Sequence, residues 1–157
     1  MPNSFMQNTH FVPGIDPVAD AFSGTVRTDV VNMNDYSAVT FILYHGVGTT
    51  GTSTLTVEAC DDVSASSTTA IPFRYKVMTS SDTQGALTAA TTSGFTTTAG
   101  SSDIYVIEAD AEEIAGTGYQ YVRLNAVESA NDPVLGGVLI LLHGARYAQD
   151  VPATAIV

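Results

Sequence analysis

The chain has 157 residues, with 16 acidic and 5 basic side chains and a formal net charge of −11. Because nucleic-acid-binding proteins neutralise phosphates with clustered Lys and Arg, this charge predicts no direct contact with nucleic acid. The single Cys60 has no partner for a disulfide within the chain, and the longest apolar stretch is far shorter than the roughly 20 residues of a membrane helix. We therefore expect a soluble single domain that folds without a disulfide or a metal and has no membrane partner.

Residues 1–24 lack the periodicity of a helix or a strand. They contain three prolines and scattered apolar side chains, among them Phe5, Phe11 and Ile15. A plain linker would carry Ser, Gly and charged residues instead. The segment is therefore predicted to be an extended N-terminal arm that lies on another surface, and the part from Phe5 to Ile15 is expected to reach a neighbouring subunit.

Residues 25–148 alternate apolar and polar side chains in short stretches separated by Gly, Ser, Asp and Thr, which is typical of β-strands. In one such stretch Leu55, Val57 and Ala59 share a face, and in another Asn125 lies on the face opposite Leu124. Strands are expected at residues 26–31, 38–45, 53–60, 73–78, 104–109, 119–126 and 138–142. Without intervening helices, these strands predict an all-β fold, an antiparallel β-sandwich of jelly-roll-like form.

Two shorter sequences within residues 25–148, a loop and a strand, carry further information. The glycine-rich residues 46–52 (GVGTTGT) supply turn positions and predict a hairpin that joins strand 38–45 to strand 53–60. Residues 138–142 (VLILL) are apolar on both faces. This pattern predicts a strand that is covered on both sides.

Three segments depart from the strand pattern. Residues 79–102 are almost wholly Thr, Ser, Ala and Gly, and a loop of that length predicts a functional loop, a mobile segment or a hidden hairpin. Phe95 is the only aromatic residue there and is expected to anchor it. Asp110 is expected to cap one helical turn that ends at Gly116. Residues 149–157 form a C-terminal tail that ends with apolar side chains.

Two strands are followed by the pair His-Gly, at His45 and His143. An apolar strand with this ending opens lipase-like hydrolases, which also need a nucleophile in the pattern G-x-S-x-G. None of the serines here has glycine at both flanking offsets, and the three histidines offer no arrangement of a base and an orienting group. We therefore expect the two histidines to be half-polar side chains at a sheet rim, and we predict no catalytic residue.

Acidic residues cluster in two places, but neither cluster has the spacing of a calcium loop. We expect the clustered acidic residues to lie in a solvated connector and at an acidic helix start. A calcium ion shared between subunits stays an open alternative. One cysteine and three distant histidines do not match a zinc site. We predict no metal-binding residue, no cofactor-binding residue and no cofactor; a glycan site stays open. The clustered acidic residues are Asp61, Asp62, Glu108, Asp110, Glu112 and Glu113.

The composition favours an assembly protein. Hydrophobic residues make up 45% of the chain and charged residues only 13%. Thr and Ser dominate the exposed strand faces, and Thr loses little side-chain entropy when a partner buries it. Together with the arm and the tail, this predicts a subunit whose apolar faces are completed by neighbours.

The order of these segments resembles the small β-rich virion structural proteins that tailed bacteriophages encode near their capsid genes, in particular capsid decoration (cement) proteins. The likeness covers about residues 25–148 and rests on YSAVTFILYHGVGTTGTSTLTVEACDD, IPFRYKV, IEADAEEI, YQYVRLNA and GGVLILLHGARY. It implies a homotrimer that binds the major capsid protein on the outer capsid surface, bridges capsomers and is assembled into virions in the host cytoplasm. The alternative is a receptor- or glycan-binding module of a virion spike, fibre or collar, with 79–102 as its recognition tip. An enzyme is not expected.

Overall fold

The computed structural model describes residues 4–79, 82–100, 102–146 and 156. Its elements are almost all β-strands, and the two helices are each about one turn long. In chain order the elements are α1 (Phe5–Asn8), β1 (Thr9–Val18), β2 (Thr25–Arg27), β3 (Val31–Asn32), β4 (Tyr36–His45), β5 (Thr52–Cys60), β6 (Thr68–Ile71), β7 (Phe73–Thr79), β8 (Thr83–Gln84), β9 (Thr88–Ala90), β10 (Phe95–Thr96), β11 (Asp103–Asp110), α2 (Ala111–Ala115), β12 (Tyr121–Ala130) and β13 (Gly136–Ala145).

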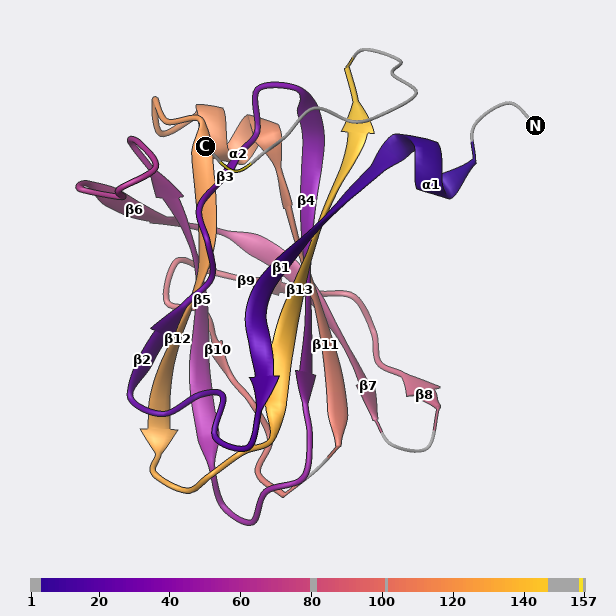
Figure 1. Ribbon diagram of the computed structural model, residues 1–157, viewed down its shortest axis with the longest axis vertical. Helices are drawn as coiled ribbons and strands as arrows, with labels where there is room; N and C mark the ends of the chain where they lie inside the picture. Colours follow the sequence, from indigo (N-terminus) through magenta and orange to yellow (C-terminus); the bar gives the residue numbers. More distant parts are fainter. Residues whose placement is uncertain (1–3, 80–81, 101, 147–155, 157) are drawn as a thin grey trace.

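The strands form two antiparallel sheets that face each other (Figure 1). Sheet A has the order β1-β13-β4-β11-β7-β8, with β9 also paired to β7. Sheet B has the order β10-β5-β12-β2, with β3 paired to β12 and β6 to β5. When β2 and β3 count as one strand and β6 to β9 as an insertion, the first, eighth, third and sixth strands form one sheet and the second, seventh, fourth and fifth form the other. This order is that of a jelly roll, which confirms the predicted fold class.

The core lies between the sheets and follows the predicted alternation. Leu55 and Val57 on β5 and Leu124 on β12 are completely buried, and the residues between the buried positions of β5 are half-buried. Asn125, predicted on the outer face, does point away from the core, yet it is 8% exposed because its amide lies against Thr56. The amide Nδ2 donates a hydrogen bond to the Thr56 hydroxyl at 3.2 Å.

The predicted hairpin at residues 46–52 is wrong. The strand before it, β4, pairs with β11 and β13 in sheet A, whereas β5 pairs with β6, β10 and β12 in sheet B. The glycine-rich loop therefore crosses the roughly 10 Å between two packed sheets. Asp132 holds the loop in place, since its carboxylate accepts hydrogen bonds from the backbone N–H groups of Thr49 and Thr50 and from the Thr49 hydroxyl.

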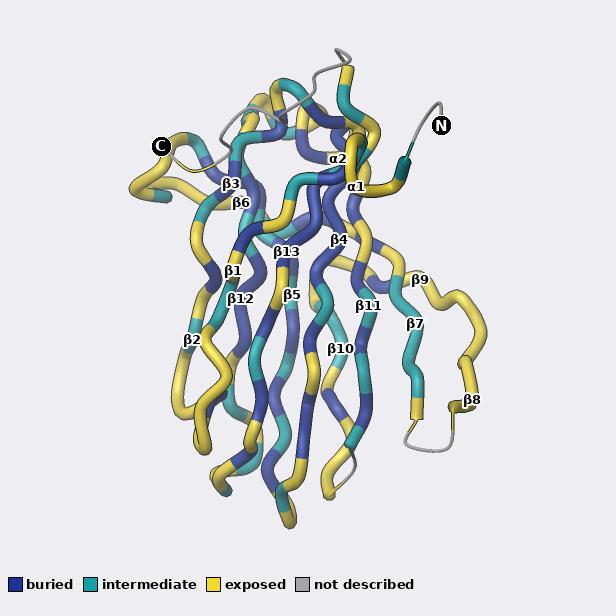
Figure 2. Tube along the Cα trace, turned by 45° about the vertical axis from the view of Figure 1, so that its right-hand side comes forward, coloured by how far each residue is buried: buried dark blue, intermediate teal, exposed yellow. Residues whose placement is uncertain are grey.

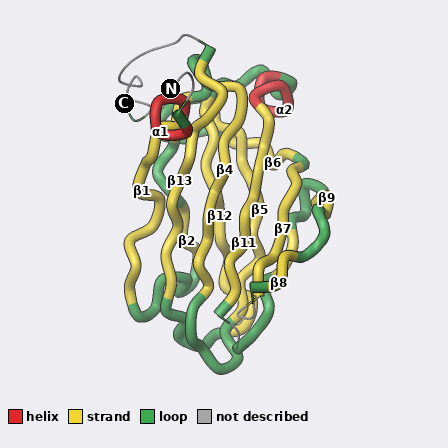
Figure 3. The backbone as a smooth tube through the Cα atoms, turned by 90° about the vertical axis from the view of Figure 1, so that its right-hand side faces the viewer, coloured by secondary structure: helices red, strands yellow, loops and turns green. Residues whose placement is uncertain are grey.

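The N-terminal segment is extended, as predicted, but most of it lies on its own chain. Residues 9–18 form β1, which pairs antiparallel with β13 at the edge of sheet A (Figure 3). Val12 and Phe22 are each only 2% exposed, so they belong to the core. The stretch from Phe5 to Ile15 thus forms α1 and part of an edge strand of this chain's own sheet, and its contact with a neighbouring subunit stays a prediction. The segment lacked a clear period because β1 has register shifts between Pro13 and Val18.

The predicted strand at residues 26–31 is divided into β2 and β3. Thr28 lies between them, and its hydroxyl accepts a hydrogen bond from the Leu124 backbone N–H at 3.0 Å, where a regular strand would use a carbonyl. The backbone N–H of Thr28 in turn donates to the Leu124 carbonyl. The side chain thus maintains the connection to β12 through the break.

The segment 79–102 contains a folded return to the sandwich. β8 and β9 pair back onto β7 in sheet A, and β10 then pairs with β5 in sheet B. Phe95 stacks on Tyr75 with ring centroids 3.8 Å apart and an interplanar angle of 4°, which is the kind of contact that the predicted anchor requires. Gly94 precedes it with φ +71°, and a Cβ there would lie 1.9 Å from the Leu55 carbonyl oxygen, so only glycine fits this close approach.

The remaining predicted segments are a helical turn and the C-terminal tail. The predicted helical turn is present as α2, between Asp110 and Gly116. The C-terminal tail predicted at residues 149–157 lies outside the described residues, apart from Ile156. Within the described part of the chain, neither helix has the length and apolar character needed to cross a membrane.

Candidate interaction surface

Sheet A has a second apolar face on the side away from the core. Along β4, Phe41 and Leu43 point inward and are fully buried, so Ile42 and Tyr44 point outward. The register aligns outward residues of neighbouring strands, for example Leu139 with Ile42. We call the outward apolar residues of five adjacent strands the outer face of sheet A; they are Phe11, Pro13, Leu139, Leu141, Ile42, Tyr44, Ile104, Val106 and Met78.

This face lies at the front in Figure 3, and Figure 2 marks its strands as a mixture of buried and exposed positions. Phe11 is 38% exposed, Leu139 40% and Tyr44 52%. The short helix α1 reaches this face, and the ring of its Phe5 lies 5.9 Å from the ring of Phe11. The strand predicted to be covered on both sides thus has Leu139 exposed to solvent in a single chain.

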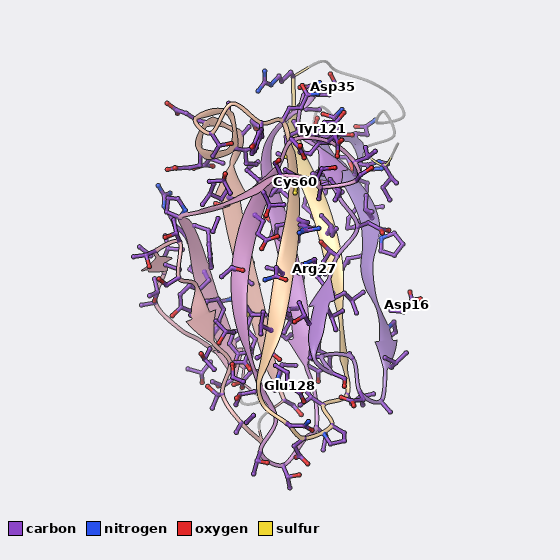
Figure 4. All side chains as sticks on the ribbon, turned by 90° about the vertical axis from the view of Figure 1, so that its left-hand side faces the viewer. Asp16, Arg27, Asp35, Cys60, Tyr121 and Glu128 are labelled. Atoms are coloured by element: carbon purple, nitrogen blue, oxygen red, sulfur yellow. The ribbon has the colours of Figure 1, made fainter. Side chains whose placement is uncertain are left out.

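The outer face of sheet B has the opposite character. Arg123 on β12 forms an ion pair with Glu58 on β5 at 2.8 Å. The Thr54 hydroxyl lies 3.0 Å from that of Thr96 and 2.7 Å from that of Ser129. Figure 4 views the molecule from this side. A sheet face that meets water is normally polar like this one, so the apolar outer face of sheet A is the exception.

A groove of about 440 Å³ lies at one end of the outer face of sheet A. It is lined by the ends of β1, β4 and β13, with Ile42, Tyr44 and Leu139 on its floor and Leu135 in its wall. Asp16 is the only charged residue among those that line it, and it is exposed at the β1 edge. The groove offers apolar contact area and no convergent set of polar groups.

The opposite end of the face carries a small polar group around His143. The Nε2 atom of His143 lies 2.9 Å from the Thr40 hydroxyl and 3.8 Å from the Glu108 carboxylate. A hydrolase triad needs the hydroxyl and the carboxylate on different ring nitrogens, so that the carboxylate orients the ring while the other nitrogen takes the proton. Here both groups lie at the same nitrogen. The three side chains therefore do not form a triad.

His45, the other histidine predicted at a sheet rim, lies in the core instead. It is completely buried, its ring stacks on Phe22 with centroids 5.8 Å apart, and its Nε2 lies 3.3 Å from the Thr97 hydroxyl. The reason is the period of β4: His45 is the next inward position after Phe41 and Leu43. Alternation along the strand was the signal for its burial, and the following glycine obscured that signal.

Most of the clustered acidic residues lie in turns and at the start of α2, whereas Glu108 lies within β11. Asp61 accepts hydrogen bonds from the backbone N–H groups of Ser67 and Asp62, and the bond from Ser67 is the main reason that its pKa is below its ordinary value. Glu112 and Glu113 lie in the exposed first turn of α2. Among the described residues, no three His, Cys, Asp or Glu side chains are close enough together to hold a metal ion.

No protein-family model matches the chain, and no curated protein matches it. The structure is similar to that of SPBc2 prophage-derived protein YomS, with 12% sequence identity and a TM-score of 0.46 over 87% of this chain and 94% of that chain. It is also similar to a chain in the structure of infectious bursal disease virus Gx strain, with 14% identity and a TM-score of 0.39 over 89% of this chain and 34% of that chain. At these TM-scores the fold assignment depends on the strand order of this chain itself.

Proposed function

We propose that this chain is a non-enzymatic structural protein of a tailed-phage virion, which decorates the capsid and stabilises it by bridging capsomers. The observation that carries the proposal is the outer face of sheet A. A soluble monomer rarely exposes a continuous apolar face across five adjacent strands, and such faces mark sites where proteins associate. The hydrogen-bonded strands of the sheet hold this face in a fixed arrangement, as a subunit of an assembly requires.

The charge distribution supports a position outside the shell. The net charge of −11 would be repelled by packed nucleic acid, whereas the outer capsid surface imposes no such cost. The proposed partners are copies of this chain and the major capsid protein. Many weak contacts around a particle add through avidity, so each subunit needs only a modest affinity to resist internal pressure.

Two observations support a role without catalysis. The hydroxyl and the carboxylate near His143 share one ring nitrogen and so cannot act as nucleophile and orienting group. Cys60 is completely buried, and desolvation raises the pKa of its thiol to about 11, far from the range in which a thiolate forms at neutral pH.

The copy number of this chain in purified particles tests the proposal. Quantitative mass spectrometry against the major capsid protein should give hundreds of copies per particle. Particles that lack the chain should release their DNA at a lower temperature than complete particles. A handful of copies would assign the chain to the tail or collar, and no copies at all would refute a virion role.

A further inference from the structure

We infer that a second copy of this chain docks on the outer face of sheet A, in a face-to-face dimer with a two-fold axis along the strands. The inference rests on the proposed function in one respect, namely that this face is a docking surface. The inference goes beyond the proposed function because it names the molecule that docks on this face, a second copy of this chain, and the orientation in which that copy docks. Three features of the face carry it: the charges on its two sides, its size and its register.

The charges on the two sides have opposite signs. The nine apolar residues of the face carry no charge themselves, and the nearby carboxylate of Glu108, in the row of Leu141, lies 3.8 Å from the Nε2 of His143 and in register with Arg74. On one side lies Asp16 at the β1 edge, where Figure 4 labels it. On the other side β7 presents Lys76, in register with Val106, and Arg74, in register with Glu108. These are two of only five basic residues in the chain.

The orientation follows from this arrangement. A two-fold axis along the strands reverses the order of the strands between the two copies, so β1 of one copy lies over β7 of the other. Asp16 then lies over β7 of the partner, about two residues along that strand from Lys76, a distance that the long lysine side chain can span. The same contact occurs twice because a two-fold interface is self-complementary. A two-fold axis across the strands would place β1 over β1 and β7 over β7, so that the acidic side would meet the acidic side and the basic side would meet the basic side. A single chain supplies both charged sides, so pairing with a copy satisfies both.

The size of the face also fits. Five strands about 4.8 Å apart and three rows of outward residues about 6.8 Å apart give an apolar area of roughly 490 Å². A specific protein interface takes about 800 Å² from each partner. The apolar face therefore supplies somewhat more than half of that area, and the polar row around His143, β8 and the loop at Leu135 lie at its margins to supply the rest.

Sedimentation velocity of the purified full chain is the first test. The chain should sediment as a dimer at micromolar concentration, and Leu139→Glu should weaken dimerisation by about 100-fold or more, because each dimer then buries two unpaired carboxylates. Val127→Glu is the matched control: Val127 is 41% exposed on the outer face of sheet B, so the same change there should leave the dimer intact. Circular dichroism checks that both variants are folded.

A charge exchange tests the orientation. Asp16→Lys and Lys76→Glu should each weaken the dimer by about 10-fold, because each creates a like-charged pair twice per dimer. The double variant restores opposite charges and should dimerise within about 3-fold of the original chain. Both side chains are at least partly exposed, so neither change removes a core contact.

The outcomes separate this inference from the proposed function. A monomer at high micromolar concentration, a trimer, or a dimer that Leu139→Glu leaves intact would overturn the inference even if particles contain hundreds of copies. Failure of the double variant to recover would overturn the two-fold orientation. A dimer that shows all the expected changes would stand even if the chain were missing from particles, and in that case only the virion role would fail.

Discussion

The substitution Phe95→Ala tests whether one aromatic ring holds the Thr- and Ser-rich segment 79–102 on the sandwich. The ring of Phe95 stacks on Tyr75 and lies 5.6 Å from the ring of Tyr105, with Phe73 on its other side at 6.1 Å. It packs against the core but is half-buried. The segment around it is otherwise small and polar, so other contacts offer little compensation.

The magnitude follows from this burial. A fully buried Phe→Ala change costs about 3 to 5 kcal/mol, and an aromatic pair adds about 0.5 to 1.5 kcal/mol beyond the area that it buries. Because Phe95 is only half-buried, we expect the free energy of unfolding to fall by about 3 kcal/mol. Phe95→Leu keeps most of the apolar contact and loses only the stacking, so it should cost about 1 kcal/mol.

Urea unfolding at one fixed protein concentration measures both changes. Far-UV circular dichroism is a suitable signal, since the chain has no tryptophan. Leu87→Ala is the control, because Leu87 lies in the same segment but is 58% exposed and should change stability by less than about 0.5 kcal/mol. If Phe95→Ala also stays within about 0.5 kcal/mol of the original chain, the ring is not the anchor and the argument fails.

Two further predictions concern titratable groups. The hydroxyl of Thr49, and then the backbone N–H of Thr50, lower the pKa of Asp132 below its ordinary 3.8. The stability that the Asp132 carboxylate contributes is therefore present above pH 3.8 and is lost as the pH falls through the lowered pKa of the folded state. The melting temperatures of the original chain and of Asp132→Asn should differ at pH 6 and converge in acid. Equal melting temperatures at pH 6 would contradict this. Cys60, with its pKa raised to about 11 by burial, should not react with a thiol reagent at pH 8 in the folded state and should react fully in urea. Rapid modification without denaturant would show that this part of the core opens.

The fold was predictable from the sequence because the strands carry a period of two. Leu55 and Val57 on β5 and Leu124 on β12 occupy the inward positions that their spacing predicts, and each is completely buried. Phe95 could be identified as an anchor because it is the only aromatic residue in a segment of small side chains. Each of these predictions depended on residues close together in the chain.

The errors concerned partners far apart in the chain. A glycine-rich loop such as residues 46–51 allows a hairpin or a crossing between sheets, and the choice depends on which strands compete for the edges of β4. In this protein β11 and β13 occupy both edges, so β5 joins the other sheet. The N-terminal segment was misassigned for a related reason: its partner, β13, lies more than a hundred residues away, and Pro13 and Pro17 obscured its strand pattern.

The sequence indicated the outer face of sheet A only indirectly, through one strand whose composition does not fit a two-layer sandwich. Residues 138–142 have the composition of a strand covered on both sides, yet a two-layer sandwich covers each sheet once. The structure resolves this by burying Ile140 and Leu142 in the core and leaving Leu139 on the outside. What covers Leu139 is a property of the assembly, and no pattern within one chain specifies it.

The edges of the sheets favour association through this face and not through added strands. Sheet A ends in β1, where Pro13 and Pro17 lack the N–H groups that an incoming strand would need. Sheet B ends in β2 and β10, which have three and two residues, too few to template a long pairing. The other edge of sheet A is formed by β8 and β9, which have two and three residues. Edge pairing is thus blocked or short on the described strands, while the outer face of sheet A remains apolar and partly exposed. Self-association should therefore depend on Leu139 and Tyr44, and Pro17→Ala, which restores an N–H on β1 outside the nine residues of that face, should leave the oligomer unchanged.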